Sequence, residues 1–234
     1  MMSLVEVDNL TKTFDGNPVL RGVTLSVAPG EFLAVVGPSG SGKSTLLYCM
    51  SGLEPATSGG VRILGHELGG MRRGALATLR RDHIGFVFQA YNLIPSLTAR
   101  ENVALPARLA HRKISAADVD QALADVGLAD RAAYRPSALS GGQQQRVAIA
   151  RVLAVRPDVV FADEPTGALD TSSGRQVLDL LAKVPADGRS VVMVTHDLSA
   201  AARADRVVVL RDGLVHRELA HSSAAEVFAA LGES

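Results

Sequence analysis

The chain has 234 residues, 47% of them hydrophobic, which is enough for one sizeable core. Its 24 basic and 24 acidic side chains cancel, so no overall positive field favours a nucleic-acid backbone, and we expect no nucleic-acid partner. The longest apolar runs, such as residues 32–36 and 207–210, are far too short to span a bilayer, and residues 1–10 are too charged for a signal peptide. We therefore expect a soluble protein in a reducing compartment, with its single thiol, Cys49, as a buried structural residue.

Three runs rich in β-branched residues open the chain, at residues 5–7, 19–27 and 32–36. They are separated by Asp15-Gly16 and Pro29-Gly30, pairs that favour turns. This alternation predicts a small antiparallel sheet that leads into a buried strand.

Strand pattern almost disappears in the middle of the chain, where helix signals take over. Ser115 and Asp118 have the spacing of a capped helix start, and Gly127 is placed to end that helix. Ser140 is placed to begin another helix, which Pro157 would end. These signals predict a helical subdomain.

The last third of the chain returns to apolar runs, which alternate with helical segments. The runs lie at residues 159–162, 190–194 and 206–210, and the helical segments lie near residues 172–183 and 198–203. Alternation of this kind is typical of βαβ units around a parallel sheet, so we predict an α/β core.

The chain is expected to end with a hairpin at Asp212-Gly213 and with a short helix capped by Ser223 and Glu226. We predict one domain over residues 1–234. Its core comprises about residues 1–89 and 156–234, and its helical subdomain comprises about residues 90–155.

A glycine-rich loop stands between the apolar run that ends at Val36 and a helix predicted from about Ser44. It fits the pattern G-x-x-x-x-G-K-[ST], in which backbone N–H groups and a helix N-terminus surround phosphate oxygens. Lys43 would reach the β and γ phosphates, and the Ser44 hydroxyl would bind Mg²⁺. The predicted nucleotide-binding residues of this loop are Gly37, Pro38, Ser39, Gly40, Ser41, Gly42, Lys43, Ser44 and Thr45.

Two adjacent carboxylates, Asp163 and Glu164, end the apolar run that starts at Val159. The carboxyl end of this strand lies beside the glycine-rich loop in a parallel sheet, so we expect Asp163 to be a Mg²⁺ partner. Glu164 is expected to act as general base on the water that attacks the γ phosphate. Taken alone, the pair would be better explained as two solvated acids before a proline turn.

The signature sequence of the ABC ATPase family is reproduced by Leu139, Ser140, Gly141, Gly142 and Gln143, and the chain resembles that family over essentially its whole length. The resemblance implies a P-loop NTPase core with a parallel sheet, an N-terminal antiparallel β subdomain and an inserted α-helical subdomain. Ser140 is suited to cap a helix whose first N–H groups bind a γ phosphate held by a second copy. We therefore expect ATP and Mg²⁺ as cofactors and a homodimer that forms on ATP binding.

Two further catalytic residues are implied by the same resemblance. Gln89 resembles the glutamine that senses Mg²⁺ and the attacking water, and we count it as a metal and nucleotide contact. His196 resembles the switch histidine that contacts the γ phosphate from the end of a strand. With Lys43 and Glu164, they complete the predicted catalytic set.

The resemblance also extends to the dimer interface and to the base. Asp170 lies in a stretch that resembles the loop crossing the interface, although Ala168 stands where many relatives have Ser or Asn. Phe14 occupies the place where the family usually stacks a tyrosine on adenine, and a phenyl ring keeps that stacking face. The alternative for Phe14 is a core residue.

Residues 85–103 resemble the subgroup that serves lipoprotein-releasing, macrolide-exporting and cell-division permeases. This implies an ATPase that drives separate integral-membrane permease subunits, held in the cytoplasm at the inner face of the cell membrane. Within the stretch, Tyr91, Leu93, Ile94 and Leu97 are too apolar for a plain solvated loop. They either pack on the following helix or line a groove that receives a permease helix.

Two other functions use the same motifs. One is a mechanotransmitting partner of a cell-wall or cell-division permease without cargo. The other is a soluble ABC ATPase of the DNA-repair type, which usually carries a long coiled coil between the motifs that here lie in one short chain. Cargo, direction of transport and permease identity belong to the membrane partner and are not encoded here. The pairs Arg72-Arg73 and Arg80-Arg81 are predicted to be solvated surface.

Overall fold

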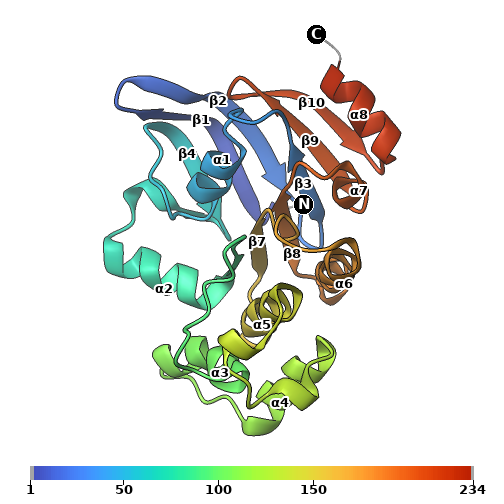
Figure 1. Cartoon of the computed structure of the whole chain (residues 1–234). Coiled ribbons are helices and arrows are strands. Elements are labelled where there is room, and N and C mark those ends of the chain that lie inside the picture. The colour runs from blue at the N-terminus through green and yellow to red at the C-terminus, as the bar shows by residue number, and fades with distance from the viewer. Residues whose placement is uncertain (1–2, 233–234) are drawn as a thin grey trace.

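The structure is a computed structural model that describes residues 3–232 (Figure 1). Its strands are β1 (Val5–Phe14), β2 (Asn17–Val27), β3 (Phe32–Val36), β4 (Ser58–Ile63), β5 (His66–Glu67), β6 (Ile84–Val87), β7 (Val159–Asp163), β8 (Ser190–Val194), β9 (Arg206–Arg211) and β10 (Leu214–Ala220). Its α-helices are α1 (Lys43–Met50), α2 (Arg73–His83), α3 (Ala99–Leu109), α4 (Ala116–Asp125), α5 (Gly141–Leu153), α6 (Thr171–Leu181), α7 (Leu198–Ala201) and α8 (Ala224–Gly232). Short 3-10 helices lie at η1 (Leu68–Gly70), η2 (Ala129–Arg131), η3 (Pro136–Ala138) and η4 (Pro185–Asp187).

The larger sheet has six strands in the order β10-β9-β3-β8-β7-β6. All neighbours are parallel except β10, which forms the predicted hairpin with β9 at the edge. Strands β3, β7 and β8 are buried along their whole length, because helices or the second sheet cover both faces. The predicted parallel α/β core is confirmed.

The smaller sheet is antiparallel, in the order β2-β1-β4-β5. Its β1–β2 hairpin turns at Asp15 and Gly16, which both have positive φ, as predicted. Strand β4 was not predicted, because Gly59 and Gly60 weaken its strand signal. A Cβ at Gly59 would lie 2.2 Å from the carbonyl oxygen of Asn9, so this strand passes β1 too closely for any side chain there.

The six-stranded sheet divides the core in two. Along β3, Phe32, Ala34 and Val36 pack with the helices of the middle and end of the chain, whereas Leu33 and Val35 pack with α1 and the antiparallel sheet. The period of two in a strand explains this separation. Because β3 is packed on both faces, the turn that follows it is held in place at the carboxyl end of the strand.

Helices α3, α4 and α5 gather beyond one end of the large sheet, at the bottom of Figure 1. The predicted caps are present: Ser115 and Asp118 form a capping box before α4, and Gly127 follows that helix with φ 69. Ser140 begins α5, which ends at Leu153, before the expected stop. None of the helices within residues 3–232 is both long and apolar enough to cross a bilayer.

Two expectations about single side chains have different outcomes. Cys49 is buried in α1, at 2% exposure, as predicted. Arg80 corrects the prediction of a solvated arginine pair, because it is half-buried on the unpredicted helix α2 and donates to the carbonyl of Gly52 at 2.9 Å. The exposed Arg72, Arg73 and Arg81 agree with that prediction.

Candidate active site

The glycine-rich loop connects β3 to α1 and requires glycine at its ends. A Cβ at Gly37 would lie 2.0 Å from the carbonyl oxygen of Leu210, and Gly42 has φ 98 and is the N-cap of α1. No side chain caps α1, so its first N–H groups remain for an anion. The hydroxyl of Ser41 is buried in the same loop without a hydrogen-bond partner among the described residues. These features fit a bound phosphate group.

Lys43 lies over this loop, with its Nζ donating to the carbonyls of Gly37 and Pro38, both at 2.9 Å. Burial lowers the pKa of Lys43, while the charges of Glu164 and then Asp163 raise it. The rest of the loop is accessible: Pro38, Ser39 and Gly40 are exposed, and Ser44 and Thr45 are half-buried. The ammonium is therefore placed to turn from two carbonyls to a phosphate.

Asp163 ends β7 as a buried carboxylate whose two oxygens are both engaged. Ser44 Oγ donates to its Oδ1 at 2.9 Å, and Tyr48 OH donates to its Oδ2 at 2.7 Å. Burial, helped by Asp163, raises the pKa of Tyr48 to about 12. Tyr48 was not predicted, since its contact depends on the packing of α1 against β7. Ser44 and Asp163 would hold Mg²⁺ together with phosphate oxygens, a mixed set that this ion accepts. Residues 3–232 contain no cluster of three or more His, Cys, Asp or Glu suited to a metal.

Glu164 and His196 form a pair at the ends of β7 and β8. Glu164 Oε2 lies 2.9 Å from His196 Nδ1 and also accepts from the His196 backbone N–H at 3.4 Å. The side chain of His196 is 71% exposed, so the pair opens to solvent. Glu164 itself has φ 46, a left-handed conformation that costs about 1–3 kcal/mol and tends to occur at functional sites. The two predicted catalytic residues are thus adjacent.

Gln89 follows β6 and is exposed. A Cβ at Gly167 would lie 3.1 Å from Gln89 Nε2, so the amide rests against the turn after Glu164. That turn is closed by a hydrogen bond from Gly167 N–H to the Glu164 carbonyl at 3.1 Å. Gln89 therefore borders the loop of Glu164, the predicted general base.

The residues of the signature sequence begin α5. Ser140 Oγ accepts from the Gln143 N–H at 3.3 Å, and the Ser140 N–H donates to Gln143 Oε1 at 2.9 Å, which completes a capping box. Leu139 is buried, and a Cβ at Gly142 would lie 2.4 Å from Ser173 Oγ on α6. No hydrogen bond among the described residues joins this motif to the loop of Lys43.

Asp170 has a local role that the sequence reading did not include. It caps α6, because its Oδ1 accepts from the N–H groups of Ser172 and Ser173, both at 3.0 Å. These hydrogen bonds lower its pKa. Asp170 and His196 line one open hollow of about 820 Å³, so the predicted interface loop and the predicted switch histidine face the same space.

Phe14 ends β1 and is 42% exposed, with Lys12 Nζ 4.5 Å from its ring centroid. This exposure contradicts the alternative that Phe14 is a core residue. The Lys12 ammonium lies over the ring as a cation–π contact, and the exposed part of the ring is available to stack on a planar ligand.

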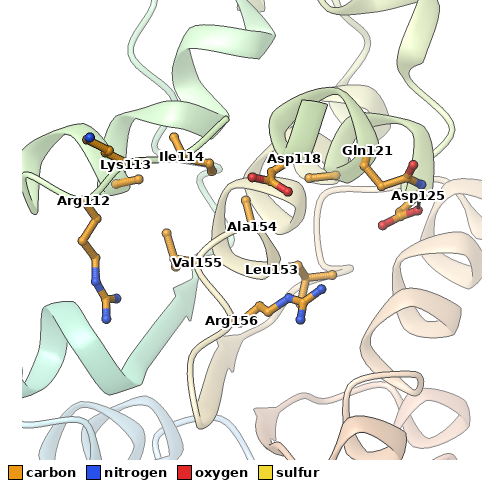
Figure 2. A pocket seen from close by; sticks show the side chains of 12 residues that line it. Arg112, Lys113, Ile114, Asp118, Gln121, Asp125, Leu153, Ala154, Val155 and Arg156 are labelled. Atoms are coloured by element: carbon orange, nitrogen blue, oxygen red, sulfur yellow. Dashed lines mark hydrogen bonds between the residues drawn. The ribbon is translucent and has the colours of Figure 1, made fainter. Parts of the chain in front are cut away.

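A second hollow, of about 430 Å³, lies among the ends of α3, α4 and α5. Figure 2 shows Arg112 and Lys113 on one side of it and Asp118, Gln121 and Asp125 on the other. None of the predicted site residues lines it.

Residues 20–167 match the ABC transporter family. The chain belongs to this family. It is 49% identical over 218 residues to the macrolide export ATP-binding/permease protein MacB of Neisseria meningitidis serogroup A, covering 91% of this chain and 34% of that protein. A MacB of Marinobacter nauticus is 44% identical over 96% of this chain and 35% of its own length. The chain thus spans about a third of these curated relatives.

Solved structures of ABC cassettes share the fold. The cassette MJ0796, determined as a dimer in a post-hydrolysis state with ADP and Pi, superposes with a TM-score of 0.86 at 42% identity, covering 94% of this chain and 99% of that one. The structure of cbiO1 from Clostridium perfringens, part of the ABC transporter complex cbiONQ, superposes with a TM-score of 0.84 at 29% identity, covering 98% of this chain and 92% of that one. The prediction of an ABC ATPase is confirmed, and the similarity to MacB agrees with the predicted resemblance to the subgroup of lipoprotein-releasing, macrolide-exporting and cell-division permeases.

Proposed function

We propose that this ABC ATPase binds ATP and Mg²⁺ between the glycine-rich loop of one copy and the α5 N-terminus of a second, and hydrolyses it to drive a membrane permease. Lys43 and the α1 N-terminus bind the phosphates, and Ser140 of the second copy closes over the γ phosphate. Phe14 stacks on the adenine. Glu164 takes the proton of the attacking water, while His196 and Gln89 orient the reacting groups.

The observation that carries this proposal is the unequal engagement of two neighbouring carboxylates. Asp163 accepts hydrogen bonds on both oxygens, from Ser44 and Tyr48, so its carboxylate is held in a fixed position where it can serve as a metal partner. The Glu164 carboxylate, 16% exposed, has hydrogen-bond or ion-pair contacts among the described residues with His196 alone, and the His196 side chain is 71% exposed. A general base needs this freedom to reach a water, whereas a metal partner does not. When bound, Mg²⁺ adds charge stabilisation at the β and γ phosphates.

A second copy completes the site. The signature residues and Lys43 lie on different parts of one chain, with no hydrogen bond between the described residues of the two motifs. Two copies related by a two-fold axis would bring each signature to the partner's nucleotide. The dimer reported for MJ0796 supports this arrangement.

The membrane partner is proposed from the relatives. Those named above combine ATP-binding and permease functions in one protein or belong to a transporter complex. We propose that this chain works on the cytoplasmic face of the membrane beneath integral permease subunits, for export of a drug, peptide or lipoprotein. A mechanotransmitting role without cargo uses the same ATPase and remains the second candidate, because the site residues are common to both.

The segment after Gln89 is the proposed permease contact, and the structure divides its apolar residues. Leu93 packs against the core, which returns it to a structural role, while Ile94 is 42% exposed. Buried Asn102 fixes this segment, accepting from the Ile94 N–H at 2.8 Å and donating to three carbonyls. Ile94 is therefore presented on a firmly held loop.

The permease contact is tested by Ile94→Glu, with Leu109→Glu as matched control because Leu109 is also exposed, at 70%. Ile94→Glu should keep basal ATPase activity and melting temperature but lose co-purification with a polytopic protein from detergent-solubilised membranes. Leu109→Glu should retain that protein. Equal retention by both variants contradicts a permease contact at Ile94.

Hydrolysis and assembly are tested together by Glu164→Gln. Turnover should fall by roughly 10²–10⁴ with ATP binding intact, because a positioned general base is lost. In ATP and Mg²⁺ this variant should be a dimer by light scattering, since slow hydrolysis lets the nucleotide-bound form persist. Glu67→Gln, an exposed change on β5, is the control and should turn over normally. A monomeric Glu164→Gln at high protein concentration contradicts the sandwich.

A further inference from the structure

Helix α5, which begins with the signature sequence, contacts the chain just before Gln89 through a buried side-chain amide. Gln145, at 0% exposure, donates from Nε2 to the carbonyl of Pro165 at 2.9 Å and to that of Phe88 at 3.4 Å. Phe88 precedes Gln89, and Pro165 follows Glu164. One side chain of α5 therefore contacts the loops of Gln89 and Glu164, two of the four predicted catalytic residues.

Arg151, also on α5, contacts the chain just after Gln89. Its guanidinium donates to the carbonyl of Asn92 at 2.6 Å and to that of Tyr91 at 3.1 Å. Tyr91 and Asn92 both have left-handed backbones, with φ 56 and 50. Two successive left-handed residues without glycine are unfavourable unless the surroundings hold them, and a planar guanidinium fork suits two neighbouring carbonyls.

Tyr91 adds a third contact, to the first turn of α5. A Cβ at Gly141 would lie 2.8 Å from the Tyr91 hydroxyl, so the phenol rests on the signature sequence itself. The segment around Gln89 is thus attached to α5 near Gly141, Gln145 and Arg151. A movement of α5 as a rigid body would therefore carry this segment with it.

The geometry points to Arg151 as a positioning residue that places Gln89 at the nucleotide through the left-handed pair Tyr91 and Asn92, with Gln145 fixing the other flank. This rests on the proposed role of Gln89. Since the α5 N-terminus would serve the nucleotide of the second copy, the arrangement ties this chain's own Gln89 to engagement of that partner.

The test is a double-mutant cycle between Arg151→Met and Gln89→Ala in the full chain. Methionine keeps the apolar length of the arginine but removes both donors. Arg151→Met should lower kcat roughly 10- to 100-fold with little change in the KM for ATP, as expected for a displaced catalytic group. In the Gln89→Ala background, Arg151→Met should lower kcat less than about twofold further, because the two changes remove one function.

Arg146→Met is the matched control. Arg146 also lies on α5, but donates to the carbonyl of Val126, inside the helical part of the chain. Hydrogen exchange supplies a second readout: amides of residues 89–93 should exchange faster in Arg151→Met but not in Arg146→Met. Arg151→Lys, which keeps the charge without the fork, is used if Arg151→Met does not fold, and should show the same exchange change.

The outcomes separate this inference from the proposed function. Equal losses of kcat from Arg151→Met with Gln89 present and absent, or unchanged exchange at residues 89–93, would overturn the positioning role. Normal turnover of Gln89→Ala would instead show that Gln89 has no catalytic role. The hydrogen bonds of Arg151 to Tyr91 and Asn92 would then have no consequence for catalysis. An impaired Gln89→Ala with a non-additive cycle and faster local exchange supports it.

Discussion

The N-termini of α1 and α5 are both proposed to bind phosphate, yet they are built differently. Helix α1 starts after Gly42 and has no side-chain cap. Helix α5 starts after Ser140, which forms a capping box with Gln143. The N–H groups of α1 are thus ready for an anion, whereas one donor of α5 is already satisfied within the chain.

This difference suggests an order of events. The glycine-rich loop leads into α1, whose first residue is Lys43, so one copy can take up ATP by itself. Ser140 Oγ accepts from the Gln143 N–H at 3.3 Å, so it can keep this cap while it donates its own O–H to a phosphate oxygen brought by another copy. The second contact is therefore expected only after the first, which makes the dimer depend on nucleotide.

The largest effect should come from the α1 side. Lys43→Ala should weaken ATP binding by about 1.5–3 kcal/mol, the value of hydrogen bonds to a charged group. Calorimetric titration of the monomer measures this, with Lys183→Ala, an exposed lysine after α6, as control. Unchanged ATP affinity in Lys43→Ala would contradict the proposed difference between the two helix N-termini, since ATP binding at α1 of a single copy would not need the Lys43 ammonium.

The base contact should have a comparable or smaller effect. Phe14→Ala should weaken ATP binding by about 1–3 kcal/mol, the value of one stacked base, while the rate at saturation changes little. Phe228→Ala removes another exposed ring, 68% exposed on α8, and should leave the dissociation constant unchanged. If both variants bind ATP like the unchanged chain, the adenine lies elsewhere.

At α5, Ser140→Ala is expected to change the free energy by less than the two variants above, but to act selectively on dimer formation. Ser140→Ala should lower the free energy of unfolding by about 1 kcal/mol through loss of a helix cap. It should also abolish the nucleotide-dependent dimer in the Glu164→Gln background while monomer ATP binding stays normal. Ser115→Ala removes the equivalent cap of α4. In denaturant unfolding it should lose as much free energy of unfolding as Ser140→Ala, but it should still dimerise. If both variants dimerise, the role of Ser140 is limited to capping α5.

The smallest effect concerns the rigidity of α1. Burial raises the pKa of the Cys49 thiol to about 11, so little thiolate exists near neutral pH. Alkylation of Cys49 at pH 8 should be slow and should change little when ATP is added, because the α1 site is already formed. A large decrease in the alkylation rate on adding ATP would show that the site forms only on binding.

Local signals determined much of the fold. The glycine-rich loop, the caps at Ser115 and Ser140, and the turn at Asp15 and Gly16 all depend on contacts within a few residues, so their patterns can be read along the chain. The motif residues could be assigned for the same reason, with the family resemblance supplying their roles.

Some elements escaped prediction because their stability comes from distant partners. Strand β4 contains two glycines and exists through its pairing with β1. Helix α2 has a single buried residue, Leu79, and is anchored in part by Arg80, whose carbonyl partner on Gly52 lies outside the helix. Neither contact leaves a periodic signature in the segment itself.

The sequence by itself determined which residues are proposed to carry the chemistry, since the loop of Lys43, the strand end at Asp163 and the cap at Ser140 are local patterns. Only the tertiary structure decided how they are held. Tyr48 meets Asp163 across 115 positions, and Arg151 meets Asn92 across 59. Such hydrogen bonds require the sheet and the helices to be packed first, because a single side chain cannot repay the entropy of closing so long a loop.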